Sequence, residues 1–294
     1  MIVVIGATRV EVGMLAGMQP ETGEENKQNK INIEYCGCGF NIAGHLAEEG
    51  RNVELITVLG NDMAGKAAVE EMKRRGIGTN GTKQLSGITP VAVRMYNVLG
   101  DIEMQQKNDE LLESFGTGLI DDNSEILKEA EAIVLDGSLP KKTIEYIACG
   151  YGASKGGKIF FDPESIYGAV KAEGLLGEFY GIMPGRVEAE TMTGGSILSP
   201  EQMMDAGIFF HSMGVGRIFI TMKGGGLYYK EGIVEGIIRP ERVLAFGRTK
   251  GAGDVASAAI VSATLDGREI EETGNHAMTK AAEYLANVKD EKLV

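Results

Sequence analysis

The sequence predicts an α/β fold in which a mainly parallel central sheet is covered by helices on both faces. Short apolar, strand-like runs alternate with helical patterns of roughly ten to fifteen residues, which is the rhythm of βαβ units. The expected strands read as almost continuous apolar segments, as strands buried on both faces do. Because ligands in such sheets bind outside the carboxyl ends of the strands, the residues that follow each strand are the first candidates for a site.

The expected elements follow from these runs in chain order. The strands of the central sheet are Ile2–Ile5, Val53–Val58, Ala132–Leu135, Lys158–Phe161, Tyr180–Met183 and Arg217–Thr221. The helices between them are Phe40–Glu49, Met63–Arg75, Lys141–Cys149 and Pro200–Met213. The second of these helices is amphipathic, Gly76 closes it, and Asp62 is placed to cap its N-terminus. Glycine or aspartate follows several of the strands, at Gly6, Gly60, Asp136, Asp162 and Gly224, and we expect all five at the same sheet edge.

Two segments depart from this rhythm. Residues 13–36 hold a polar patch between two strand-like pieces, and residues 87–107 contain a hairpin with its turn at Gly100-Asp101. Together they are expected to form a small β-sheet set apart from the main one. No internal repeat, low-complexity tract or clear linker divides the chain, so residues 1–294 are interpreted as a single domain.

Composition and charge narrow the class of protein. The 294 residues are 43% hydrophobic and 24% charged, which is ordinary for a soluble globular protein. The net charge of −13 argues against a nucleic-acid or membrane-surface partner. An anionic nucleotide substrate remains compatible, because a helix terminus and Mg²⁺ act locally. The absence of a signal-like or membrane-spanning run, with only three cysteines, indicates a cytoplasmic protein.

The cysteine pair Cys36-x-Cys38 is the one local pattern that suggests a metal site. No second cysteine pair follows it, and His45 is the only histidine nearby. Zinc sites of this kind need further thiolate or imidazole ligands. The spacing alone therefore does not predict a metal site here.

The most informative stretch is Gly251-Ala252-Gly253-Asp254, which runs directly into an apolar helix. Two glycines let the backbone approach a ligand, and the unpaired N–H groups of the helix start face it. A carboxylate would repel an anion bound there, but it would suit phosphoryl transfer, where it accepts a proton from the attacking hydroxyl. A packing turn before a buried helix is the alternative interpretation of the same residues.

This stretch resembles the signature of the ribokinase-like (PfkB) carbohydrate kinases, which have an α/β fold with a small β-sheet lid. The resemblance implies that Asp254 is the catalytic base and that Gly251, Ala252 and Gly253 form the anion hole. Gly37 and Asn41 match a Gly-Gly-x-x-x-Asn pattern whose asparagine binds sugar hydroxyls, with Cys36 in place of the first glycine. A tight turn in which Asn41 pairs with local backbone is the structural alternative.

Other family positions carry different residues in this chain. Arg9 and Glu11 stand where the family has an Asn-x-Asp that binds the sugar, so both are candidates for substrate binding, or for pairing with each other. Glu188 matches the glutamate that helps to place Mg²⁺, although Gly185 replaces the asparagine before it. Arg248 replaces an aspartate that supports a monovalent-cation site, so activation by K⁺ is not expected.

The glycine-rich turn after the strand Arg217–Thr221 resembles the turn that borders ATP in this family. Its candidates for nucleotide binding are Lys223, Gly224 and Gly226, and a solvated turn is the equal alternative. Neither a Walker P-loop nor a dinucleotide-binding Gly-x-Gly-x-x-Gly is present, which argues against those nucleotide-binding classes.

Three further segments are similar to the pseudouridine-kinase branch of the family: Val134–Pro140, Phe161–Ser165 and Arg186–Glu190. That similarity implies transfer of the γ-phosphoryl group of ATP, with Mg²⁺, to the 5′-hydroxyl of pseudouridine. A kinase for ribose or adenosine, or a non-catalytic relative that binds a nucleoside or nucleotide, are the alternatives. The resemblance also implies a homodimer formed through the lid.

Overall fold

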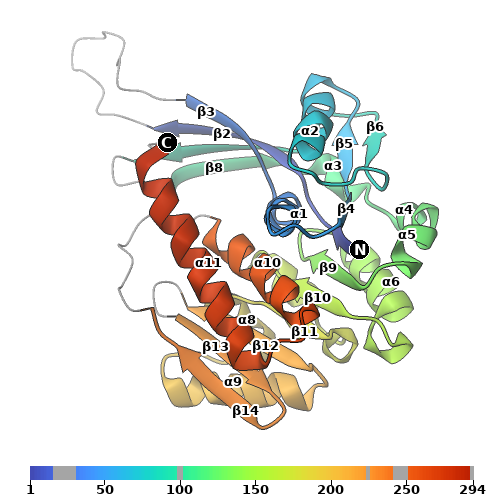
Figure 1. The fold of residues 1–294 in the computed structure, drawn as a ribbon. Coiled ribbons are helices and arrows are strands. Elements are labelled where there is room, and N and C mark those ends of the chain that lie inside the picture. The colour runs from blue at the N-terminus through green and yellow to red at the C-terminus, as the bar shows by residue number, and fades with distance from the viewer. Residues whose placement is uncertain (16–30, 98–101, 223–225, 241–250, 292–294) are drawn as a thin grey trace, which may run out of the picture.

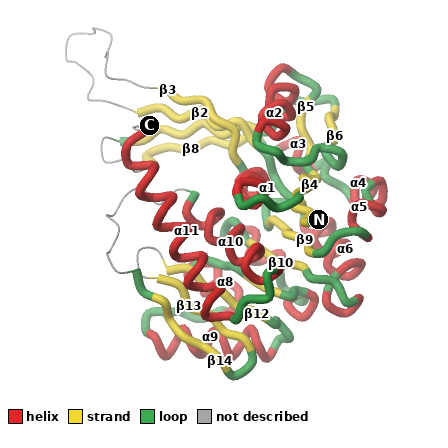
Figure 2. The backbone as a smooth tube through the Cα atoms, in the orientation of Figure 1, coloured by secondary structure: helices red, strands yellow, loops and turns green. Residues whose placement is uncertain are grey.

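The computed structural model describes residues 1–15, 31–97, 102–222, 226–240 and 251–291, and its centre is an eight-stranded sheet (Figures 1 and 2). The strand order is β14-β13-β12-β11-β10-β9-β1-β4, with parallel pairing from β4 to β12 and antiparallel pairing from β12 to β14. The strands are β1 (Ile2–Ile5), β4 (Val53–Ile56), β9 (Ala132–Asp136), β10 (Ile159–Asp162), β11 (Gly181–Ile182), β12 (Arg217–Met222), β13 (Gly226–Glu231) and β14 (Val234–Ile238). The mainly parallel sheet is confirmed, and the hairpin of β13 and β14 extends it beyond the last predicted strand.

Helices cover both faces of this sheet (Figures 1 and 2). One face carries α1 (Cys38–Glu48), α10 (Ala252–Leu265) and α11 (Ile270–Glu291). The other carries α4 (Thr117–Asp122), α5 (Ser124–Lys128), α6 (Lys141–Tyr151), α8 (Arg186–Thr193) and α9 (Pro200–Ser212). The remaining helices are α2 (Met63–Arg74), α3 (Glu110–Glu113) and α7 (Ile166–Lys171), with short 3₁₀ turns at Ala153–Lys155 and Leu176–Glu178.

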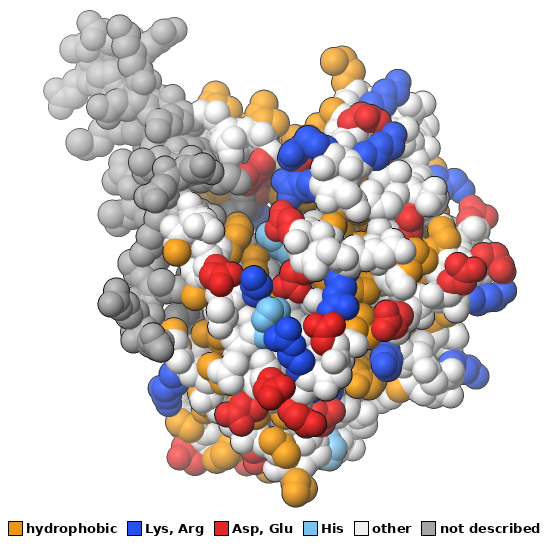
Figure 3. Space-filling view, in the orientation of Figure 1, with side chains coloured by type: hydrophobic (Ala, Val, Ile, Leu, Met, Phe, Trp, Pro, Cys, Tyr) orange, Lys and Arg blue, Asp and Glu red, His pale blue; other side chains and the backbone are white. Residues whose placement is uncertain are grey.

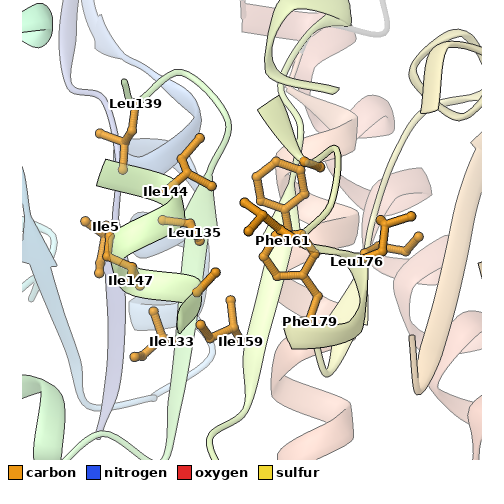
Figure 4. Close-up of a cluster of buried hydrophobic side chains, with 14 of the residues drawn as sticks. Ile5, Ile133, Leu135, Leu139, Ile144, Ile147, Ile159, Phe161, Leu176 and Phe179 are labelled. Carbon is orange, nitrogen blue, oxygen red and sulfur yellow. The ribbon is translucent and has the colours of Figure 1, made fainter. Parts of the chain in front are cut away.

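The strands divide their side chains between two hydrophobic cores, one on each face. In β1, Ile2 and Val4 belong to the core under α1 and α10, whereas Val3 and Ile5 belong to the opposite core. This alternation with period two explains why the strands read as continuous apolar runs. Figure 4 shows part of the core on the face opposite α1 and α10. In this core the ring of Phe161 stacks on that of Phe179, with centroids 4.7 Å apart.

A second, four-stranded sheet has the order β3-β2-β7-β8 and projects from one end of the molecule (Figure 1). Its strands are β2 (Arg9–Leu15), β3 (Ile31–Cys36), β7 (Val91–Tyr96) and β8 (Ile102–Asn108). The expected hairpin is present as antiparallel β7 and β8, although its predicted turn lies outside the described residues. The small sheet begins four residues earlier than expected, at Arg9 rather than residue 13, so it includes both candidate substrate residues of this segment.

The predicted strand Val53–Val58 is wrong at its end, because the chain changes sheets there. β4 stops at Ile56, and β5 (Val58–Gly60) pairs with β6 (Lys83–Leu85) in a separate two-stranded sheet. Gly60 therefore does not lie at the carboxyl edge of the main sheet as expected. Asp62 caps α2, where its side chain accepts a hydrogen bond of 2.7 Å from the amide of Gly65. The capping interpretation of Asp62 is thus confirmed.

The surface mixes charges of both signs. On the face shown in Figure 3, Lys and Arg side chains lie among Asp and Glu side chains rather than in a separate patch. Within the described part of the chain, no helix is long and apolar enough to cross a membrane.

Candidate active site

The N-terminus of α10 opens at the carboxyl edge of the main sheet. Gly251 precedes the helix with φ 83° and ψ −16°, a left-handed conformation that favours glycine. The amide of Val255 donates the first intrahelical bond, of 3.1 Å, to the carbonyl of Gly251. The amides before Val255 belong to the first turn, which has no carbonyl partner inside the helix, so this end of α10 can receive an anion.

Asp254 lies in this first turn and accepts a hydrogen bond from Asn41. The distance from Asn41 Nδ2 to Asp254 Oδ2 is 2.7 Å, across 213 residues of sequence. Asn41 itself lies in the first turn of α1. The side chain of Asn41 therefore bonds to Asp254 across the fold, and the two predicted site residues lie together where two helices begin.

A second carboxylate, Asp162, lies beside Asp254 at the end of β10. It accepts hydrogen bonds of 2.6 Å from Ser257 Oγ and 2.9 Å from the amide of Glu164. Burial raises the pKa of Asp162 to about 7. Burial, together with the negative charge of Asp162, raises the pKa of Asp254 to about 8, against the effect of the hydrogen bond from Asn41.

These raised pKa values predict that the free energy of unfolding of the protein falls as the pH rises. A carboxyl group whose pKa is higher in the folded state than in the unfolded state stabilises the fold fully below about pH 4, and that stability is lost as the pH rises through 7 to 8. We expect Asp162→Asn to remove part of this pH-dependent loss of stability, because asparagine does not ionise. At about 1.4 kcal/mol per pKa unit, the variant should gain on the order of 2–4 kcal/mol relative to wild type between pH 4 and pH 8.

Chemical denaturation of metal-free protein across this pH range measures the difference. Asp205→Asn, at an exposed position of α9, is the matched control and should show no such gain. A constant difference between wild type and Asp162→Asn would contradict the prediction.

The strand ends are fixed by a third carboxylate, Asp136, which is fully buried at the end of β9. Its side chain accepts hydrogen bonds from the amides of Ala7 (2.9 Å), Gly39 (3.0 Å) and Ser138 (2.7 Å). Burial raises the pKa of Asp136 despite these bonds. The carboxylate thus joins the turns after β1 and β9 to the start of α1, which places Asn41.

Gly39 makes a close backbone approach at this junction. A Cβ at Gly39 would lie 2.8 Å from both the Cα and the carbonyl carbon of Gly6, closer than real Cβ atoms come. We therefore expect Gly39→Ala to destabilise the protein by about 1–3 kcal/mol, as overpacking against backbone does. Thermal unfolding tests this, with Gly150→Ala as control, because a Cβ at Gly150 meets nothing within 4 Å. An unchanged Tm for Gly39→Ala would contradict the prediction.

Arg9 and Glu11 lie on one face of the small sheet, but they are not paired with each other. Arg9 forms a two-pronged ion pair with Asp109, from Nε at 2.7 Å and from Nη2 at 3.0 Å. Burial opposes the charge of Arg9, yet the hydrogen bonds and charge of Asp109 raise its pKa overall. Glu11 pairs with Arg94 and accepts a hydrogen bond of 2.9 Å from the hydroxyl of Tyr96.

The thiol of Cys36 also lies on this face, with its sulfur 3.6 Å from Glu11 Oε2. Gly37 follows with φ 118°, and a Cβ there would clash with the carbonyl of Ala7, so the turn into α1 requires glycine. Lys107 of β8 lies 3.6 Å from Glu164 Oε1. Each of the cations Arg9, Arg94 and Lys107 is therefore matched by a carboxylate.

Two of the remaining candidates, Glu188 and Gly226, lie around the end of β12. Glu188 is in the first turn of α8 and folds over Gly185, where a Cβ would clash with its carboxylate. The negative charge of Glu188 also contributes to the raised pKa of Asp162, so the two carboxylates are close enough to interact. Gly226 starts β13 with φ 114°. Lys223, Gly224 and Arg248 lie outside the described residues.

Sequence reasoning missed several groups around the site. They come from four separate parts of the chain and are Cys38, Arg94, Tyr96, Asp109, Glu164 and Ser257. Two of them had a local signal. Ser257 lies one helical turn after Asp254 and points to the same side, and Cys38 belongs to the Cys36-x-Cys38 pattern, which was judged only as part of a cysteine and histidine site.

The comparisons with known proteins agree with this architecture. The model of the pfkB family carbohydrate kinases matches residues 1–287. The chain is 25% identical to the pseudouridine kinase of Escherichia coli, over 97% of this chain and 92% of that protein. It is 23% identical to the ribokinase of Haemophilus influenzae, over 88% of this chain and 84% of that protein.

Solved structures share the fold. The ribokinase of Thermotoga maritima aligns with a TM-score of 0.80 at 22% identity, over 96% of this chain and 91% of that one. The ribokinase of Arabidopsis thaliana, solved with ribose and ATP, aligns with a TM-score of 0.79 at 20% identity, over 95% and 90% of the two chains. With a family match over nearly its whole length and this fold, the chain belongs to the pfkB family of carbohydrate kinases, which are phosphotransferases.

Proposed function

We propose that this kinase transfers the γ-phosphoryl group of ATP to the 5′-hydroxyl of pseudouridine. The observation that carries the chemistry is the position of Asp254 in the first turn of α10, bonded to Asn41 and facing Asp162. Similarity to a pseudouridine kinase at 25% identity supports the choice of substrate.

In this proposal Asp254 is the general base and the first turn of α10 is the anion hole. Asp254 accepts the proton of the attacking hydroxyl, which Asn41 helps to orient. The amides of Gly251 to Gly253 donate to the oxygens of the transferred group, where negative charge develops. Holding the two reactants in line can supply roughly 7–11 kcal/mol of the barrier, so positioning matters as much as the base.

ATP and Mg²⁺ fit the groups on this edge of the sheet. Glu188 offers a carboxylate, the hard oxygen donor that Mg²⁺ takes, and lies beside the end of β12 where the family turn borders the nucleotide. Bound Mg²⁺ would neutralise charge on the phosphate oxygens. Lys223, Gly224 and Gly226 stay candidates for contacts with the nucleotide, and Arg248 still argues against a K⁺ requirement.

The charges of the small sheet favour a neutral acceptor over a phosphorylated sugar. Arg9, Arg94 and Lys107 are each paired with a carboxylate, so none is a free cation for a phosphate group. Glu11 and Asn41 can accept and donate hydrogen bonds to hydroxyls. We propose that Arg9, Glu11, Gly37 and Asn41 line the acceptor site.

Release of ADP from Mg-ATP across a panel of acceptors tests the proposal. The panel is pseudouridine, uridine, adenosine, ribose and fructose 6-phosphate. Turnover confined to pseudouridine is the expected result, and preference for ribose or adenosine would keep the kinase but change its substrate. Nucleoside binding by calorimetry without turnover of any acceptor would favour a non-catalytic binding protein.

We further propose that residues 1–294 act as one domain in which the small sheet is a lid over the acceptor and a dimer contact. Its outer face carries exposed apolar side chains, among them Ile33 (68% exposed), Val93 (45%) and Met104 (53%). Such a face on a two-sided sheet suits burial against a second copy. Sedimentation at micromolar concentration should give a dimer that Ile33→Lys weakens, and a wild-type monomer would exclude it.

A further inference from the structure

Three metal-ligating side chains meet beside the start of α10. One ligand atom each from Cys38, Asp162 and Asp254 lies within 4.8 Å of the other two. They come from α1, the end of β10 and α10, so the fold assembles the group from three distant parts of the chain. The Cys36-x-Cys38 spacing alone did not predict this group, because the partners of Cys38 are carboxylates from distant parts of the chain rather than a second cysteine pair.

The types of ligand select the class of metal. A thiolate is a soft ligand that favours Zn²⁺ and similar ions, whereas Mg²⁺ prefers oxygen ligands only. One sulfur and two carboxylate oxygens make three protein ligands, and a tetrahedral ion would keep its fourth position for water or substrate. Zn–S bonds of about 2.3 Å and Zn–O bonds of about 2.1 Å at a tetrahedral ion place the ligand atoms about 3.5 Å apart. The three atoms, which lie within 4.8 Å of one another, would therefore have to come closer on binding.

The two carboxylates also lack a positive partner among the described residues. Asp254 accepts hydrogen bonds from the neutral amide of Asn41 and from the thiol of Cys38. Asp162 accepts them from Ser257 and from the amide of Glu164. Cys38 is 5% exposed, and no cationic side chain joins the group. Two neighbouring buried carboxyl groups with no cationic partner among the described residues are an environment in which a divalent cation can take the place of their protons.

We propose that Cys38, Asp162 and Asp254 form a site for a thiophilic divalent cation such as Zn²⁺, and that its occupancy inhibits the kinase. On binding, the thiol of Cys38 and whichever of the two carboxyl groups are protonated release their protons to solvent. The sulfur and the carboxylate oxygens then bond to the metal, with no change of oxidation state. The carboxylate of Asp254 then shares its lone pair with the metal and cannot accept the proton of the acceptor hydroxyl. The inhibition rests on the proposed function, whereas the binding of the metal does not.

Binding of Co²⁺ to the metal-free full chain, without ATP, tests the site directly. Wild type should bind one Co²⁺ with a near-ultraviolet sulfur-to-cobalt charge-transfer band, and Zn²⁺ should displace it. Cys38→Ser should lose the band and bind at least about tenfold more weakly. Cys149→Ser is the matched control, because Cys149 is exposed and outside the group, and it should behave as wild type.

The outcomes separate this proposal from the proposed function. A charge-transfer band lost only in Cys38→Ser supports the site even if no acceptor is phosphorylated. Equal Co²⁺ binding by wild type and Cys38→Ser, or displacement by Mg²⁺ as readily as by Zn²⁺, would overturn it. If wild type is an active kinase, micromolar Zn²⁺ should inhibit it at constant Mg-ATP, and full activity with the metal bound would overturn the inhibitory role.

Discussion

Replacing Asp254 by asparagine is expected to lower kcat by about 10²–10⁴, the usual contribution of a general base. The substitution keeps the shape of the side chain, and its amide oxygen can still accept the hydrogen bond from Asn41. The binding constants of ATP and acceptor should therefore change little. ADP release gives kcat, and calorimetry of the acceptor gives its binding constant.

The pH dependence of kcat/KM in wild type gives a second, independent test of Asp254 as the base. With the pKa of Asp254 raised to about 8 by burial and by Asp162, most of the base is protonated at pH 7. The value of kcat/KM should rise with pH through about 8 and then level off, because only the deprotonated form accepts a proton. Asp162→Asn removes the neighbouring negative charge, so it should move this rise to lower pH.

Asp205→Asn serves as the control for both measurements, because it makes the same change on an exposed face of α9. It should leave kcat and the pH profile as in wild type. Full activity of Asp254→Asn in protein shown to be folded would remove Asp254 from the role of base. A profile that does not move in Asp162→Asn would mean that the two carboxylates do not interact.

Much of this fold could be predicted because its signals are local. Apolar runs with glycine or aspartate after them marked β1, β9 and β10, and the structure places those strands side by side. The predicted strand Val53–Val58 failed because a strand that continues into a different sheet keeps the same apolar pattern. A sequence pattern records burial, whereas the choice of partner strand depends on the rest of the fold.

The site could be predicted only in part, for a similar reason. Gly251 and Asp254 carry a local signal, since a glycine turn and a helix start are read from adjacent residues. The bond between Asn41 and Asp254 spans 213 residues, and the pair of Arg9 with Asp109 spans 100. The sequence does not show whether Arg9 pairs with Glu11 or with Asp109, because both are acidic. The register of β2, β7 and β8 decides between them.

Two substitutions in the glycine turn should separate its structural role from its catalytic role. Gly251→Ala should lose both stability and activity, because φ is 83° there and a Cβ would lie 2.5 Å from the hydroxyl oxygen of Tyr284. Gly253→Ala meets nothing within 4 Å and lies inside a helix, so it should keep or raise the Tm. Its methyl group would instead occupy open space at the N-terminal start of α10, where the proposed anion hole receives the phosphoryl group.

We therefore expect Gly253→Ala to lower kcat by about 10²–10³, the loss typical when one anion-hole contact is displaced, with an unchanged Tm. Gly150→Ala, also a helical glycine with open space around it, controls for the effect of a methyl group on helix stability. Thermal unfolding and ADP release are measured on the same preparations. If Gly253→Ala retains full kcat, the phosphoryl group does not approach this turn, and the helix start has only a packing role, the alternative that the sequence left open. If activity falls while Tm holds, the glycine at this position is explained by the ligand and not by the fold.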